Sequence, residues 1–114
     1  PGASINVANN GTNEGTYVDI RNNQVYGSDL SCMLVFSGAN VVVSGGTVMG
    51  NTTSFCERGL VVVGNFIVTQ NLAQNNELED YNFVSAPNAA AVKGINDSPG
   101  PWNNISNQTP VPEG

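Results

Sequence analysis

The sequence between residues 17 and 84 alternates short apolar runs with glycine, asparagine and serine. Each run spans three or four residues, which suits a short β-strand better than a helix. Valine dominates the runs, and its branched side chain favours strands. The chain is therefore predicted to be all-β. The runs cover residues 17–20, 24–26, 33–36, 41–43, 47–49, 60–63, 66–68 and 81–84.

These runs recur with an internal period. Ile20 and Val43 are 23 positions apart, as are Val25 and Val48, and a third copy follows 20 positions later, from Val48 to Val68. A repeat of this length with three short strands is what a coil of stacked parallel strands requires. We therefore expect a coil of three to four turns. The alternative is a small antiparallel β-sandwich in which the period is a coincidence.

Asparagine at a bend of such a coil can pair its side-chain amide with the same residue one turn away. Asn51 and Asn71, which are 20 positions apart, are the candidates. The position one repeat before Asn51 is Ser28, so the expected ladder has only two rungs.

The two cysteines, Cys32 and Cys56, are 24 positions apart, close to one repeat. Residues one turn apart have Cα atoms near the strand spacing, which a disulfide can bridge. We therefore predict a disulfide that joins adjacent turns, which favours an oxidising, extracellular or virion-surface location. The alternative is a pair of buried, reduced thiols.

Three segments carry a family resemblance: residues 18–27 (VDIRNNQVYG), 39–51 (ANVVVSGGTVMGN) and 63–71 (VGNFIVTQN). Over residues 17–84 the chain resembles the repeats of right-handed parallel β-helix proteins, the pectate-lyase-like superfold that also occurs in viral tailspikes. The resemblance implies a short right-handed parallel β-helix. Many members of that family degrade polysaccharides with paired aspartates, a catalytic arginine or lysine, or calcium-binding acids.

None of those catalytic residues can be assigned to a position in this chain. Asp19 and Arg21 share one face of an expected strand, which a surface ion pair explains equally well. Glu77, Glu79 and Asp80 are close in sequence, and they either hold a cation or form a solvated acidic patch. We therefore expect no enzyme activity, no cofactor and no metal site.

Charge and composition exclude further functions. The formal net charge is −6, with only three basic residues and no histidine. No basic face can therefore neutralise nucleic-acid phosphates, and histidine-dependent catalysis is excluded. No run of apolar residues is long enough for a membrane span.

The chain is expected to divide into a β-rich domain at residues 1–84 and an extended arm at 85–114, which holds five of the six prolines. Trp102, the single tryptophan, lies in this arm. Three roles are open for it: an interface anchor, a platform that stacks on sugar rings, or a cover for the open end of the coil.

Five Asn-X-Ser/Thr triplets mark candidate glycosylation sites at Asn10, Asn51, Asn96, Asn104 and Asn107. The abundance of asparagine explains most of them, and glycosylation is the alternative.

These features predict a non-catalytic structural or assembly protein: a small virion- or extracellular-surface subunit that forms a homo-oligomer or docks on a larger assembly. The first alternative is a glycan-binding module, which Trp102 and the many asparagines motivate. A fragment of a polysaccharide lyase or hydrolase is the third hypothesis, and it depends on fold analogy alone.

Overall fold

The computed structural model describes residues 4–9, 16–37, 44–84, 87–95, 97 and 100–108. Over these residues the chain forms three β-sheets and no helix, which confirms the all-β prediction. Sheet A contains, in order, β1 (Ile5–Asn9), β4 (Ser31–Ser37), β7 (Arg58–Val63) and β10 (Glu79–Val84). Sheet B contains β2 (Thr16–Arg21), β5 (Ser44–Met49), β8 (Ile67–Thr69) and β11 (Asn88–Ala89). Sheet C contains β3 (Gln24–Tyr26), β6 (Thr52–Ser54), β9 (Leu72–Gln74), β13 (Asn104–Ser106) and β12 (Val92–Gly94).

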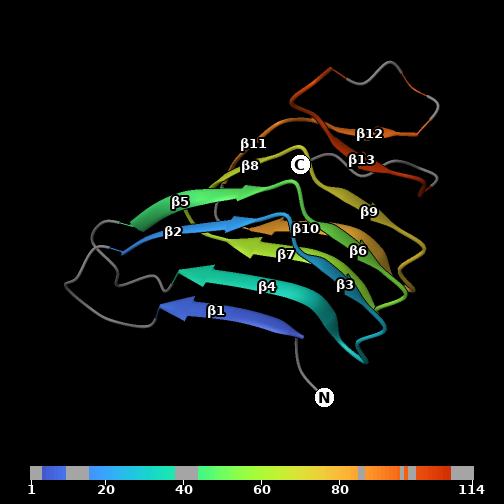
Figure 1. Cartoon of the computed structure of the whole chain (residues 1–114), viewed down its shortest axis with the longest axis horizontal. Helices are drawn as coiled ribbons and strands as arrows, with labels where there is room; N and C mark the ends of the chain where they lie inside the picture. The colour runs from blue at the N-terminus through green and yellow to red at the C-terminus, as the bar shows by residue number, and fades with distance from the viewer. Residues whose placement is uncertain are drawn as a thin grey trace.

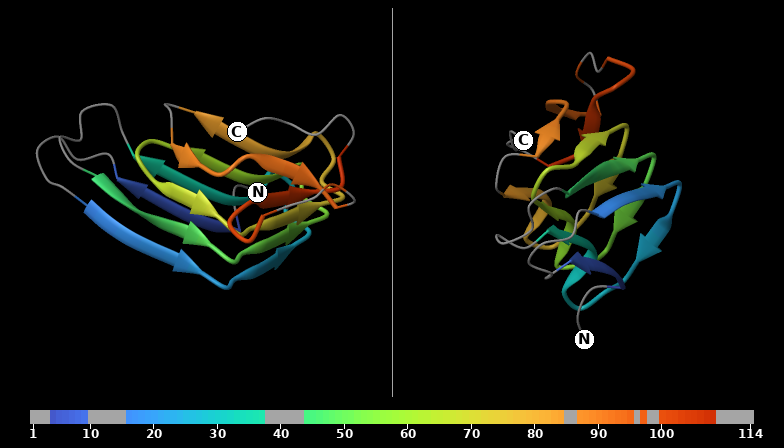
Figure 2. Two further views of the ribbon diagram at one scale, coloured as in Figure 1. Left: turned by 90° about the horizontal axis from the view of Figure 1, so that it is seen from above. Right: turned by 90° about the vertical axis from the view of Figure 1, so that its left-hand side faces the viewer.

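The chain visits sheets A, B and C in rotation (Figure 1). Every described strand pair is parallel, so the antiparallel sandwich is not supported. We call β1–β3 the first layer, β4–β6 the second, β7–β9 the third, and β10, β11 and β13 the fourth. Figure 2 shows the first layer, in blue, at one end of the stack and the last strands, in orange and red, at the other. This arrangement is compatible with a parallel β-helix.

Apolar side chains of like position lie over one another and form the core between the sheets. In sheet A, Met33 pairs with Leu60, and both are almost completely buried. In sheet B, Val48 lies between Ile20 and Val68, and all three are buried. Each layer thus covers the apolar face of the layer beneath it, which is the main source of stability in a stack of this kind.

The spacing between layers differs in part from the predicted period. Val48 lies opposite Val68 as predicted, but Ile20 pairs with Val48 and not with Val43. The separation is 28 residues between the first and second layers and 20 between the second and third in sheets B and C. Most of the difference arises between sheets A and B, because the connection at residues 38–43 is longer than the one at 64–66 and β5 is longer than β8. The strand expected at residues 41–43 lies outside the described residues.

A column of asparagines, buried except for the half-buried Asn23, follows the bend between sheets B and C. The Nδ2 of Asn23 donates to Oδ1 of Asn51 at 3.0 Å, Asn51 donates to Asn71 at 3.0 Å, and Asn71 donates to Asn104 at 2.9 Å. In each rung the backbone N–H of the donor residue bonds the same oxygen. The ladder therefore has four rungs, whereas two were predicted. Asn23, not Ser28, precedes Asn51, because the first spacing is 28 residues.

The ladder also binds the backbone of the layer before it. The second Nδ2 proton of each buried asparagine reaches a carbonyl oxygen three positions before the preceding rung. The pairs are Asn51 with Ile20, Asn71 with Val48 and Asn104 with Val68. Buried amides of this kind stabilise a fold only when all of their donors and acceptors are used, as they are in these three rungs.

The residue before each of the first three rungs has a left-handed backbone, which turns the chain sharply from sheet B into sheet C. These residues are Asn22 (φ 58°), Gly50 (φ 69°) and Gln70 (φ 57°). At Gly50 a Cβ atom would lie 2.5 Å from Oδ1 of Asn22, the end of an exposed side chain that can move aside, so glycine is favoured there by the left-handed backbone and not by space.

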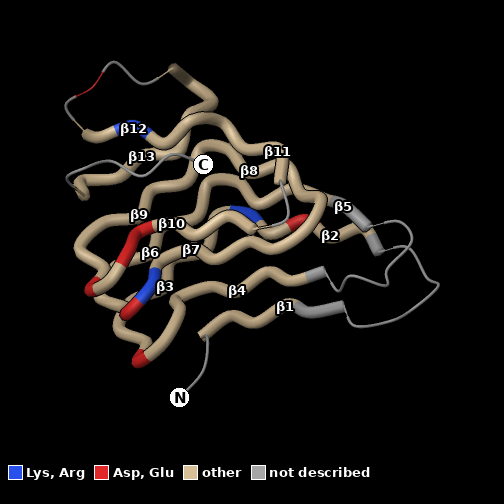
Figure 3. Tube along the Cα trace, turned by 180° about the vertical axis from the view of Figure 1, so that it is seen from behind, with Lys and Arg blue, Asp and Glu red and all other residues tan. Residues whose placement is uncertain are grey.

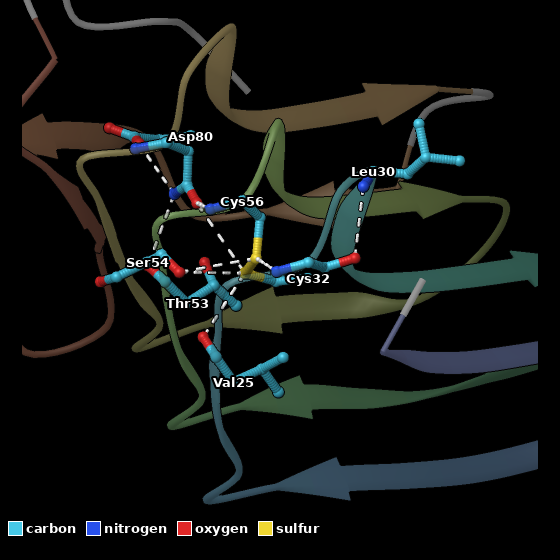
Figure 4. Close-up of a disulfide and its surroundings, with 9 residues drawn as sticks. Val25, Leu30, Cys32, Thr53, Ser54, Cys56 and Asp80 are labelled. Carbon is cyan, nitrogen blue, oxygen red and sulfur yellow. Dashed lines mark hydrogen bonds between the residues drawn. A yellow bond between two sulfur atoms is a disulfide. The ribbon is translucent and has the colours of Figure 1, made fainter. Parts of the chain in front are cut away.

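The predicted disulfide is confirmed. Cys32, at the start of β4, is bonded to Cys56, in the bend that follows β6 (Figure 4), and their Cα atoms are 5.5 Å apart. Both residues are buried. The bond therefore closes one circuit of strands from β4 through β6 and ties the second layer to the start of the third.

Segments of the expected C-terminal arm continue the sheets. β11 pairs with β8, and β13 pairs with β9. β12 precedes β13 in sequence but lies outside it in sheet C, so β13 is inserted between β12 and β9. β11, β12 and β13 therefore add to the stack, where composition had indicated an extended conformation, because short strands can pair with the open edges of β8, β9 and then β13.

We predict that Asn71→Ala lowers the free energy of unfolding by about 3 kcal/mol, because it leaves buried donors and acceptors of two neighbouring layers without partners. Urea unfolding of wild type and variant measures this change. Asn65→Ala is the matched control: Asn65 is exposed, and its replacement should change stability by less than about 0.5 kcal/mol. Equal effects of the two substitutions would contradict a stabilising role for the ladder.

Candidate functional site

The acid–base pair expected on a strand is a surface ion pair. Arg21 and Asp19 lie 3.9 Å apart on β2, and the side chains are 49% and 46% exposed. The hydroxyl of Thr47 on the next strand also donates to Asp19. This carboxylate is thus already occupied by two neighbours on an open sheet face.

The three acidic residues near residue 80 do not come together. Glu79 binds Arg58 at 2.9 Å, Glu77 is exposed, and Asp80 is buried. Figure 3 shows few charged residues over the sheets and a group of them where β7 and β10 begin. Among the described residues, no group of three or more histidine, cysteine, aspartate or glutamate side chains is arranged to hold a metal ion.

Trp102 lies in a turn beside the third layer. Its carbonyl oxygen accepts a bond from the N–H of Gln70 at 3.2 Å, and the Gln70 side chain donates to the carbonyl of Pro101 at 2.7 Å. The tryptophan residue is nevertheless 61% exposed. The ring therefore does not bury itself over the end of the stack, and it is free to contact another molecule.

Two of the five candidate glycosylation sites lie in the interior. Asn51 and Asn104 are at most 1% exposed, and their side-chain nitrogens are hydrogen-bonded within the ladder, so a glycan at either site is incompatible with this fold. Asn107 is exposed, and its side chain donates to Asn75 at 2.9 Å. Asn10 and Asn96 lie outside the described residues.

At the C-terminal end of the stack the asparagine ladder stops. Val92 of β12 lies opposite Asn104, so an apolar side chain occupies the position where the next amide would be. The Nδ2 of Asn104 donates instead to the carbonyl of Ala90 at 2.9 Å, in addition to the carbonyl of the preceding layer. All the polar atoms of this amide therefore have partners.

Two neighbouring polar side chains of β10, Asp80 and Tyr81, make buried hydrogen bonds that hold the fourth layer in place. Asp80 is 1% exposed, and it accepts bonds from Nδ2 of Asn76 at 3.0 Å and from the hydroxyl of Ser106. The hydroxyl oxygen of Tyr81 lies 2.9 Å and 2.6 Å from the carbonyl oxygens of Asn71 and Ile105, which share its single proton. Burial raises the pKa of Tyr81 well above its ordinary value of 10.0, and the neighbouring Asp80 raises it further.

The N-terminal end of the stack is different, and we call it the open end: the outer edges of β1, β2 and β3 together with Asn23. Each of these strands is the last in its sheet, as β10, β11 and β12 are at the other end, and no described residue pairs with its outer edge. Ile5, Val7 and Val18 pack against the core but are only half-buried, whereas Met33 in the second layer is fully buried.

Asn23 is the incomplete rung of the ladder. Its Nδ2 donates to Asn51, but no described residue donates to its Oδ1 or accepts its second Nδ2 proton. In Asn51 and Asn71 both of these needs are met by the layer before. The open end thus combines unpaired strand edges, half-buried core residues and a half-buried amide whose Oδ1 has no partner among the described residues.

Asn23 and Asn104 were not predicted from the sequence as ladder residues. A local signal was present: each rung follows a glycine, an asparagine or a glutamine, in the pairs 22–23, 50–51, 70–71 and 103–104. Glycine and asparagine tolerate the left-handed bend before a rung. The same pattern also occurs at 9–10, 64–65, 74–75 and 75–76, so it narrows the candidates without identifying the rungs.

Comparisons with protein-family models, with curated proteins and with solved structures found no match to the chain. No helix long and apolar enough to cross a membrane occurs in the part of the chain that the structure describes. The open end is therefore the candidate functional site on its geometry alone.

We expect the free energy of unfolding to fall as the pH rises above about 10, because the unfolded chain ionises Tyr81 near its ordinary pKa of 10.0 whereas the folded chain keeps it neutral. The stabilising contribution is complete below this pH and is lost in the alkaline range. Urea unfolding between about pH 8 and pH 11 measures the slope, with mass spectrometry to verify the disulfide. Tyr81→Phe should flatten the slope, and an unchanged alkaline decline in that variant would show that another group is responsible.

Proposed function

We propose that this chain is a non-catalytic structural subunit, folded as a short right-handed parallel β-helix of three to four turns and docked on a larger assembly through its open end. The rotation of the strands through three parallel sheets supports the helical coil. The stacking of Ile20, Val48 and Val68 supports a regular succession of turns.

The open end is the single observation that carries the docking function. A row of unpaired strand edges is a template for pairing with another chain, and natural proteins usually cover, distort or charge such edges. Here three adjacent edges lie at one end, above the half-buried apolar residues Ile5, Val7 and Val18. A neighbouring chain that covers this end would bury these side chains and satisfy the edges together.

The disulfide supports an oxidising environment, and we place the subunit on an extracellular or virion surface for this reason. The charged groups support a non-catalytic role. Arg58 is bonded to Glu57 and Glu79, each at 2.9 Å, and Asp19 is bonded to Arg21 and Thr47. In these surface ion pairs each charge is neutralised by its neighbour. Among the described residues, no second catalytic group lies beside them.

If docking covers the open end, the isolated chain should show weak amide protection in its first layer. We expect amides in β1–β3 to exchange about a hundredfold faster than those in β5–β9, since one edge of each first-layer strand faces water. Hydrogen exchange followed by NMR on the isolated chain measures this difference, and sedimentation velocity establishes the oligomeric state. A monomer whose first layer is as well protected as its third would overturn the docking function.

Glycan binding is the second candidate function, and the exposed ring of Trp102 favours it. An exposed indole offers an apolar face on which a sugar ring can stack. The asparagines that were expected to bind sugar hydroxyls give less support, because Asn51, Asn71 and Asn104 are buried in the ladder.

A glycan array tests this second candidate. If the function is correct, wild type binds at least one class of glycan and Trp102→Ala weakens binding about tenfold, the effect of one lost stacking contact. Tyr17→Ala is a suitable control, because Tyr17 is an exposed aromatic residue on β2, away from the turn that carries Trp102. Binding that survives Trp102→Ala unchanged, or no binding at all, would remove this candidate.

A further inference from the structure

We propose that the corner where sheet C turns into sheet A binds a positively charged segment of another protein, one that carries apolar side chains between its basic residues. This corner lies along the side of the stack, so the proposal goes beyond the docking function and does not depend on what covers either end. Four exposed apolar residues carry it, and we call them the corner surface: Tyr26, Leu30, Phe55 and Leu78.

The turns from sheet C to sheet A bring the corner surface together. Tyr26 ends β3 and Phe55 follows β6. Leu30 and Leu78 directly precede β4 and β10. The N–H of Glu57 donates to the carbonyl of Leu30 at 2.9 Å, and the N–H of Leu78 donates to the carbonyl of Glu57 at 2.7 Å. The two leucines therefore lie in one column, with Glu57 between them.

The residues of the corner surface are open to solvent. Phe55 is 66% exposed, Tyr26 54% and Leu78 53%. Among the residues with described positions, nine large hydrophobic residues are exposed, and four of them are at this corner. Single exposed apolar residues are ordinary on a protein surface, whereas a group of them on neighbouring layers is typical of a contact surface.

Phe55 is held in a backbone conformation that suits other residues better. Its φ is 59°, in the left-handed region that disfavours a bulky side chain. The equivalent positions in the layers before and after are Gly27 (φ 82°) and Asn75 (φ 57°), which tolerate this region. The fold therefore does not require phenylalanine at this position, and contact of the ring with a partner accounts for the strain.

The charge beside the corner surface selects the partner. Asp29 and Glu77 are exposed. Arg58 is bonded to Glu57 and to Glu79, each at 2.9 Å. These four carboxylates and one guanidinium carry half of the formal net charge of −6, and Figure 3 shows the acidic residues, in red, grouped beside a basic one. Lysine or arginine of a partner therefore meets opposite charge here, whereas a second copy of this chain would bring the same carboxylates against them.

The corner also fixes the order of apolar and basic groups in the partner. Asp29 directly precedes Leu30, and Glu77 directly precedes Leu78. Glu57 lies between the two leucines in the column. Carboxylates thus alternate with apolar side chains, and a segment in which basic residues alternate with apolar ones complements both.

The probe is a short capped peptide of alternating leucine and lysine, titrated into the full chain and followed by NMR. We expect amide shifts at the corner surface and binding about tenfold weaker in Phe55→Asn, the loss typical of one aromatic anchor. Tyr17→Asn, the same replacement at an exposed aromatic residue on β2, is the matched control and should leave binding unchanged. Glu77→Gln should weaken binding about threefold, because it removes one charge and no apolar contact.

Urea unfolding separates a role in binding from a role in folding. Phe55→Asn should unfold at the same urea concentration as wild type or a higher one, because asparagine tolerates the left-handed backbone. A clearly less stable Phe55→Asn chain would show that the ring serves the fold, and it would overturn the proposal.

Three further results would also overturn it. The first is equal binding of the peptide by wild type and Phe55→Asn. The second is equal binding of a peptide with serine in place of leucine, or glutamate in place of lysine. The third is a different occupant: a dimer in sedimentation velocity, or a glycan on an array, that the native chain forms or binds and Phe55→Asn does not.

Discussion

The hydrogen bond from one buried asparagine to the next is the interaction on which the rest of the structure depends. It fixes where the chain bends from sheet B into sheet C, since the amide of Asn51 must lie between Asn23 and Asn71. The bend in turn sets the register of the strands on either side. With the register fixed, the apolar residues lie over one another and the core forms.

The same interaction explains why the two ends of the stack differ. Every bond between two asparagine side chains of the ladder runs in one direction: Nδ2 of an earlier layer donates to Oδ1 of a later one. The column therefore ends in an unused acceptor on one side and in the satisfied amide of Asn104 on the other. A stack of neutral amides thus gains a polarity without any charged residue.

The sequence alone predicted the strands, the parallel stacking and the disulfide. Strand propensity, turn residues and the spacing of the two cysteines can each be recognised within about one repeat. The register of the first layer could not be predicted in this way. The valine-rich runs resemble one another, so Val43 and Val48 are equally suitable partners for Ile20 in the next layer. Which of them pairs with Ile20 depends on the length of the connection at residues 38–43. Asn104 was missed because β12 intervenes and places it 33 residues after Asn71.

The disulfide has a mechanical consequence for a subunit held in an assembly. Tension applied to the two ends of the chain passes directly from Cys32 to Cys56, because the sulfur–sulfur bond is the shorter covalent path. The segment between them, with β5 and β6, carries no load and cannot be drawn out. With a separation of 24 residues, about 80 Å of contour length is withheld from extension. A reduced chain would release that length, so its extensibility under force depends on its redox surroundings.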